Sequence, residues 1–140
     1  MLPVSLKDNK SNVSVVISPH GEMITAPFSP NQIQHYKMDM INTAYVFAPP
    51  LVGSSMRLQN ILMYGSKNVG VNDATVVIYT SLDPTATAGT TVMEFEVPEK
   101  QSRDLINLNI ALPEGVYLLA TTNDNDIYMT MMGYYIHNSI

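Results

Sequence analysis

The sequence has 140 residues, of which 46% are hydrophobic and only 14% are charged. This length corresponds to one domain and argues against a two-domain enzyme. Soluble domains usually carry about 25% charged residues, so the surface is expected to be neutral and polar or to be covered by a partner. The formal charge of -5 argues against binding to nucleic acid or to an anionic membrane. Disulfides, thiol catalysis and cysteine-based zinc sites are excluded because the chain has no cysteine.

The N-terminal sequence MLPVSLKDNKSNV lacks the apolar core of a signal peptide, and apolar runs elsewhere extend over only a few residues. A helix that crosses a bilayer needs about 20 consecutive apolar residues. We therefore expect neither a signal peptide nor a membrane span.

Proline and glycine recur at short intervals along the chain, and the segments between them are rich in Val, Ile, Thr and Tyr. Segments of this composition, with alternating or continuous apolar residues, are typical of β-strands. The pattern predicts eight or nine strands, over residues 13–18, 33–40, 43–48, 56–64, 74–81, 91–97, 104–111, 116–122 and 126–136.

Two of these segments alternate most regularly between apolar and polar residues. In TVMEFEV, residues 91–97, Glu94 and Glu96 are predicted to face solvent. In DLINLNIA, residues 104–111, the two internal asparagines are predicted to do the same. The side chains predicted to face a core are Met93, Phe95, Val97, Ile106, Leu108 and Ile110.

The number and spacing of the strands predict an all-β fold, an antiparallel β-sandwich that is jelly-roll-like and has an extended N-terminal arm. The arm is assigned to residues 1–31 because its first twelve residues are mostly polar, and the sandwich domain is assigned to residues 32–140. An isolated arm would fray. We expect a neighbouring subunit to hold it, and docking onto the same chain is the alternative.

Metal and cofactor sites are not expected. His35 and Asp39 would share one face of a strand but lie about 13 Å apart, too far for one ion. Asp124 and Asp126 alternate with asparagines, as in a calcium loop, but the remaining ligands and the glycine of such a loop are missing. A turn is the better interpretation of this segment.

The sequence also contains no nucleophile elbow and no nucleotide-binding glycine loop. Glu94 and Glu96 would lie on one strand face about 6 to 7 Å apart, a spacing that permits glycoside hydrolysis. The chain has no Trp and no line of aromatic platforms. We therefore predict that the protein is not an enzyme and keep a small carbohydrate-active enzyme as a third hypothesis.

The last predicted strand, IYMTMMGYYI, is apolar on both faces. It fits a central strand that the opposing sheet covers on one side. The arm or another subunit would cover the other side, since Met and Tyr are enriched at subunit interfaces. Packing in the core alone is the favoured interpretation of the Met and Tyr side chains, and a subunit interface is the alternative.

Four segments together resemble a group of small virion proteins of tailed bacteriophages, over nearly the whole chain from about Val13 to Ile136. They are VSVVISPHGEMITAP, NTAYVFAPPLVGSSMRLQNILMYGSKNVGVNDATVVIYTS, SRDLINLNIALPEGVYL and MTMMGYYI. In such proteins a short N-terminal segment precedes a β-sandwich whose last strand ends in Gly-Tyr-Tyr. The resemblance implies a capsid decoration or cement protein, or a tail-fibre or adaptor module, commonly trimeric. It implies no catalytic residue.

We therefore expect a structural protein located in a virion, first of all a capsid decoration or cement protein. Its partners would be the major capsid protein or other virion proteins and further copies of itself, with a trimer favoured, and neither nucleic acid nor membrane. The expected contact residues are Val4, Leu6, Val15, Ile17, Met23, Ile24, Phe28, Tyr134, Tyr135 and Ile136.

The alternative function is a tail-fibre or adaptor module that recognises a glycan or protein on the host surface. Such a module would present exposed aromatic and amide or carboxylate side chains at the tips of its loops. Tyr64 and residues 123–126 are the candidates for this role.

Overall fold

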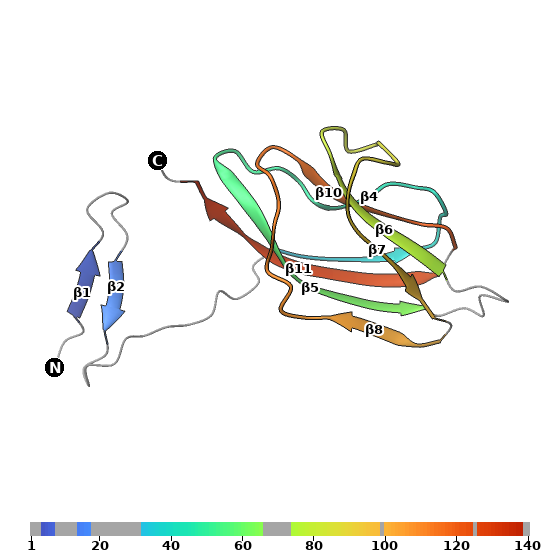
Figure 1. The fold of residues 1–140 in the computed structure, drawn as a ribbon, viewed down its shortest axis with the longest axis horizontal. Helices are drawn as coiled ribbons and strands as arrows, with labels where there is room; N and C mark the ends of the chain where they lie inside the picture. The colour runs from blue at the N-terminus through green and yellow to red at the C-terminus, as the bar shows by residue number, and fades with distance from the viewer. Residues whose placement is uncertain are drawn as a thin grey trace.

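The computed structural model describes residues 4–7, 14–17, 32–65, 74–98, 100–124 and 126–138. All regular structure in this part of the chain is β-strand, and two antiparallel sheets pack together (Figure 1). The prediction of an all-β antiparallel sandwich is confirmed. Within the described ranges, no helix is long and apolar enough to cross a membrane.

The strands follow the Pro and Gly punctuation of the sequence. They are β1 (Val4–Lys7), β2 (Ser14–Ile17), β3 (Gln32–Met38), β4 (Tyr45–Ala48), β5 (Ser54–Gly65), β6 (Ala74–Ser81), β7 (Thr90–Val97), β8 (Ser102–Leu105), β9 (Ile110–Ala111), β10 (Tyr117–Thr122) and β11 (Ile127–His137).

The two packed sheets are built from strands that are far apart in the sequence. One sheet has the order β4-β10-β6-β7, and the other has the order β3-β11-β5-β8 with β9 also paired to β5. The first strand of the sandwich therefore pairs with the last (β3 with β11), and the second pairs with the last but one (β4 with β10). The chain thus resembles one long hairpin. Its successive strand pairs lie alternately in the two sheets.

The core lies between the sheets and follows the two-residue period of the strands. In β11, Ile127, Met129 and Met131 are buried, while the residues between them are only partly buried. Val76 and Ile78 of β6, in the opposite sheet, belong to the same core. Each fully buried side chain of this size stabilises the fold by about 1.5–3 kcal/mol relative to an exposed one. The predicted central position of the last strand is confirmed, since β11 lies between β3 and β5.

The predicted alternation in residues 91–97 is confirmed in β7. Val97 is fully buried, and Met93 and Phe95 pack against the core. Glu94 and Glu96 are exposed. The pattern predicts the structure here because β7 has a single face that contacts the opposing sheet.

The predicted continuous strand over residues 104–111 is wrong, since the segment forms β8 and β9 with a break between them. Asn107 and Asn109 have φ values of 57° and 49°, in the left-handed region that Asn tolerates better than most residues. The Asn107 backbone N–H donates to Asn60 Oδ1 at 3.1 Å, which stabilises the break. Ile106 is consequently 62% exposed rather than in the core, whereas the other two predicted core residues of this segment pack against the core as expected.

The loop between β6 and β7, residues 82–89, contacts the outer face of the β4-β10-β6-β7 sheet at Tyr79 and Thr80. Tyr79 faces away from the core, and its hydroxyl donates to the Ala86 carbonyl of this loop at 2.6 Å. A Cβ on Gly89 would collide with the Thr80 carbonyl oxygen, so only glycine allows this close approach. Tyr79 and Leu119, its partner across the strands, are both buried.

In the N-terminal part of the chain, β1 and β2 form an antiparallel hairpin, which Figure 1 draws in blue. The strand predicted over residues 13–18 corresponds to β2, whereas β1 was not predicted. The strands of the two packed sheets lie between Gln32 and His137. An extended arm over residues 1–31 stays a prediction, because most of this range lies outside the described residues.

Candidate functional site

The loop between β4 and β5 presents apolar side chains at one end of the sandwich. Val52 is 97% exposed and Leu51 is 49% exposed. Beside them is an open hollow of about 380 Å³. The hollow is lined by Gln32, Pro49, Pro50, Leu51 and Tyr135, and these residues together with Val52 are termed the proline-loop surface.

A hydrogen-bond network holds this loop in place. The Glu114 carboxylate accepts from the Gly53 backbone N–H at 2.9 Å and from the Asn138 side-chain amide at 2.9 Å. The Asn138 backbone N–H donates to the Gly53 carbonyl at 2.7 Å. Gly53 has a φ of 73°, which glycine adopts without strain. The loop that carries the exposed apolar tip is therefore anchored at Gly53.

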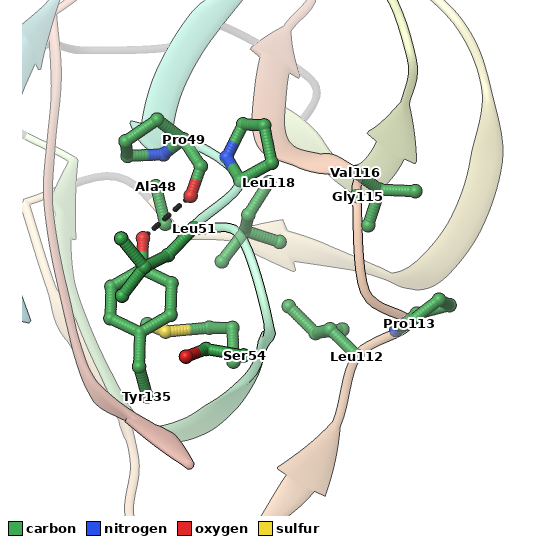
Figure 2. A pocket seen from close by; sticks show the side chains of 12 residues that line it. Ala48, Pro49, Leu51, Ser54, Leu112, Pro113, Gly115, Val116, Leu118 and Tyr135 are labelled. Atoms are coloured by element: carbon green, nitrogen blue, oxygen red, sulfur yellow. Dashed lines mark hydrogen bonds between the residues drawn. The ribbon is translucent and has the colours of Figure 1, made fainter. Parts of the chain in front are cut away.

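Tyr135 supports the same loop from β11, as Figure 2 shows. Its hydroxyl donates to the Pro49 carbonyl at 2.6 Å, and burial raises the pKa of this hydroxyl. The adjoining cavity between the loop, Leu112 and Leu118 has a volume of about 10 Å³. Such a volume holds about one water molecule, so it is a packing defect under the loop and no ligand site.

A second hollow lies on the outer face of the β3-β11-β5-β8 sheet. Tyr64 of β5 and Tyr128 of β11 are directly opposite each other in the register, and Leu62 is opposite Thr130. The hollow is shallow, with a volume of about 200 Å³. Its lining, termed the tyrosine hollow, comprises His35, Leu62, Met63, Tyr64, Ser102, Asp104, Tyr128 and Thr130.

Side chains on β3 fix one edge of the tyrosine hollow. The His35 ring stacks on the Tyr128 ring, with centroids 6.1 Å apart and an interplanar angle of 22°. His35 Nδ1 and Thr130 Oγ1 are hydrogen-bonded at 2.7 Å. Lys37 Nζ lies 5.8 Å from the centroid of the Tyr128 ring, within the range of a cation–π contact. The Tyr128 ring is thus contacted by two side chains of β3, whereas Tyr64 is 40% exposed.

Seven of the contact residues predicted from the sequence fall in the N-terminal part of the chain. Four of them are cross-strand partners in the β1–β2 hairpin, as the pairs Val4↔Ile17 and Leu6↔Val15. The other three, Met23, Ile24 and Phe28, lie outside the described residues. Their role as contacts stays a prediction.

The remaining three predicted contact residues are consecutive in β11 but do not share one environment. Tyr135 packs against the core and belongs to the proline-loop surface. Tyr134 and Ile136 are half-buried and alternate with it along the strand. A contact that uses all three side chains at once would have to wrap around both faces of the strand.

Sequence reasoning missed both hollows. Apolar residues in the Pro49–Val52 turn were a signal for the first, because turns between strands are usually polar. Tyr64 was assigned to a loop tip, but it lies on the sheet within β5. Asn123, from the same set of predicted tips, is exposed after β10 and also bonds to β6, since its Oδ1 accepts from the Thr75 backbone N–H at 2.7 Å.

The acidic residues considered for chemistry are dispersed on the surface. Glu94 and Glu96 project from the edge strand β7 into solvent. Asp126, with a φ of 61°, lies 3.7 Å from Lys37 Nζ in an exposed ion pair. Among the residues that the structure describes, no three His, Asp or Glu side chains are grouped as metal ligands.

Comparison with known proteins finds no matching family model, no matching curated protein and no matching solved structure. The arrangement of the strands and the chemistry of the two hollows are therefore the observations from which a function is argued.

Proposed function

We propose that this chain is a non-enzymatic structural protein of a tailed-phage virion, a capsid decoration or cement protein. The proposed contact with the neighbouring virion protein is the proline-loop surface. The observation that carries this proposal is the exposed apolar tip of Leu51 and Val52, on a loop that the Glu114 network anchors at Gly53. The phage context rests on the sequence resemblance.

An apolar tip on an anchored loop suits attachment for energetic reasons. Burying an exposed aliphatic side chain contributes about 1.5–3 kcal/mol. A loop that is already ordered loses little entropy on binding. With many copies on one particle, these modest contact energies would together stabilise the shell. The low fraction of charged residues, 14%, also suits a surface that is covered by partners.

We further propose that the sandwich is a jelly roll. When β8 and β9 are taken as one interrupted strand, the two sheets contain eight strands. The first pairs with the eighth, the second with the seventh, the third with the sixth and the fourth with the fifth. A long hairpin wound into two four-stranded sheets has this pairing, and the jelly roll is the eight-stranded double-sheet form.

The N-terminal residues are proposed to add to the same contact. Gln32 is the first residue of β3 and also lines the proline-loop surface. The described part of the sandwich therefore begins at this surface. Contacts of the hairpin residues Val4, Leu6, Val15 and Ile17 with a neighbouring subunit, in a trimer or on the shell, belong to this proposal.

The proposal is tested on purified particles of the phage that encodes the chain. Electron microscopy is expected to show density for the protein repeated over the icosahedral shell. Density confined to the tail would contradict the cement role and would support a receptor-binding or adaptor module. Deleting residues 1–12 is expected to weaken attachment to the particle.

Point variants test which surface makes the contact. Val52→Asp and Leu51→Asp are each expected to reduce the copies bound per particle at least about tenfold, because each places a charge in an apolar interface. Leu82→Asp is the matched control, since Leu82 is an equally aliphatic, 79% exposed loop residue outside the proline-loop surface. Equal loss from all three variants, or no loss from any, would overturn the assignment of the surface.

A further inference from the structure

We propose that the tyrosine hollow is a binding site for a neutral saccharide. This inference goes beyond attachment to a virion partner, because it uses another part of the molecule. None of the residues that line the tyrosine hollow belongs to the proline-loop surface. Each proposal can therefore fail without the other.

The hollow offers aromatic and apolar surface for the C–H faces of a sugar ring. Tyr64 and Tyr128 lie across from each other on adjacent strands and form its walls. Leu62, two residues before Tyr64 in β5, contributes to its apolar lining. Tyrosine rings provide large, rigid contact area at a low cost in conformational entropy. His35 and Lys37 position the Tyr128 ring, and Tyr64, which is 40% exposed, provides the open aromatic surface.

The edge formed by β8 supplies hydrogen-bonding groups to the hollow. Asp104 is opposite Leu62 in the register, and Ser102 is opposite Tyr64, so both border the hollow. Neither side chain makes a hydrogen bond or an ion pair in the part of the chain that the structure describes. A carboxylate accepts hydrogen bonds from two adjacent hydroxyls, and the serine hydroxyl donates or accepts one more. Hydroxyl groups around an apolar ring are the chemistry of a saccharide.

Charge and size disfavour anionic and large ligands. The Asp104 carboxylate would repel a phosphate, a sulfate or a carboxylate placed over the hollow. The volume of about 200 Å³ is smaller than the roughly 300–1,000 Å³ of sites for drug-sized molecules. One sugar unit of a longer glycan fits this space better than a nucleotide does. The structure therefore favours a neutral pyranose unit.

The experiment uses the full chain, fluorescently labelled, on a printed array of neutral, sialylated and sulfated glycans, where dense printing compensates for weak binding. We expect binding to one or more neutral glycans. The strongest of these is then titrated into ¹⁵N-labelled protein. Amide shifts are expected at residues of β5, β8 and β11 around the hollow.

Four variants decide whether the hollow is the site. Tyr64→Ala and Asp104→Asn are expected to weaken binding at least about tenfold. Tyr64→Phe retains the ring and is expected to retain most of the binding. Tyr117→Ala is the control, because this half-buried tyrosine lies at the start of β10 in the other sheet. Both Tyr64 and Asp104 are exposed, so their replacement leaves the core intact.

Three results would overturn the proposal. They are the absence of any bound neutral glycan, binding that Tyr64→Ala and Asp104→Asn leave unchanged, and binding restricted to sulfated or sialylated glycans. Self-association of the full chain that Tyr64→Ala abolishes, seen by sedimentation in the absence of glycan binding, would instead show that this face is an interface between copies.

Discussion

The two sheets of the sandwich differ in how far their outer faces are exposed to solvent. On the β4-β10-β6-β7 sheet, the chain's own β6–β7 loop contacts the outer face, and Tyr79 and Leu119 are 1% and 0% exposed. On the β3-β11-β5-β8 sheet, Ile33 is 59% exposed and Tyr64 is 40% exposed. Both faces carry apolar and aromatic side chains. The chain's own loop contacts the outer face of the first sheet, whereas the outer face of the second sheet remains accessible to a ligand or partner.

This difference separates residues that stabilise the fold from residues that are available for binding. An apolar side chain on the covered face contributes its burial to the folded state, as a core residue does. The same kind of side chain on the open face contributes much less to folding and keeps its surface for a second molecule. Substitutions of matched residues on the two faces should therefore affect different properties.

The largest expected effect is on Leu119. Leu119→Ala should lower the free energy of unfolding by about 3 kcal/mol, because it removes a fully buried side chain and leaves a cavity. Leu62→Ala on the open face should cost about 1 kcal/mol or less. Chemical denaturation of the two variants measures both values. Equal losses would show that the open face is as important for folding as the covered one.

The next effect concerns the hydrogen bond between the covered face and its loop. Tyr79→Phe removes the donor to the Ala86 carbonyl and should lower the free energy of unfolding by about 1 kcal/mol. Protease cleavage in residues 82–89 should become faster. Tyr64→Phe is the matched control on the open face and should change neither quantity. Unchanged cleavage in Tyr79→Phe would mean that other contacts hold the loop.

Alkaline pH provides a smaller test of the same comparison. Burial raises the pKa of the Tyr79 hydroxyl above its ordinary value of about 10. A raised pKa in the folded state means that the stability is complete below this ordinary value and is lost as pH rises through the folded-state pKa. Unfolding measured above pH 10 should therefore depend less on pH in Tyr79→Phe than in the unchanged protein. The same slope in both would contradict this role for Tyr79.

The smallest expected effect is at the start of the β6–β7 loop. The backbone N–H and the hydroxyl of Thr85 donate to the Asp83 carboxylate, and these bonds lower its pKa. Because the folded-state pKa is depressed, the contribution is present above the ordinary pKa of Asp and is lost as pH falls through the folded-state value. Asp83→Asn should flatten this acid dependence of unfolding. The same acid dependence of unfolding in Asp83→Asn and in the unchanged protein would contradict this role for Asp83.

Much of the strand pattern was predictable because local composition carries it. Residues 91–97 have one buried and one exposed face, and a two-residue period reports that directly. Residues 104–111 have the same period, yet they break at Asn107 and Asn109. The break depends on Asn60, which is 47 positions away from Asn107. A local pattern contains no information about such a distant acceptor.

The candidate sites were less predictable than the strands. Of the three predicted contact residues in β11, Tyr135 lies in the proline-loop surface. Tyr64 was selected for its aromatic side chain, but its partner Tyr128 was not. The two tyrosines lie on neighbouring strand positions only because β5 and β11 pair in one register. Shifting that register by one residue would turn one of the rings to the opposite face of the sheet.

The order of apolar, polar and turn-forming residues determined that this chain forms antiparallel strands packed in two layers, because strand period and turn chemistry act over a few residues. The tertiary structure decided which face is closed and which groups meet. Glu114 reaches Gly53 across 61 positions, and Tyr79 is covered by a loop whose path depends on Gly89. Such contacts arise from strand pairing and loop packing between distant segments, and their energies exist only once the sheets are assembled.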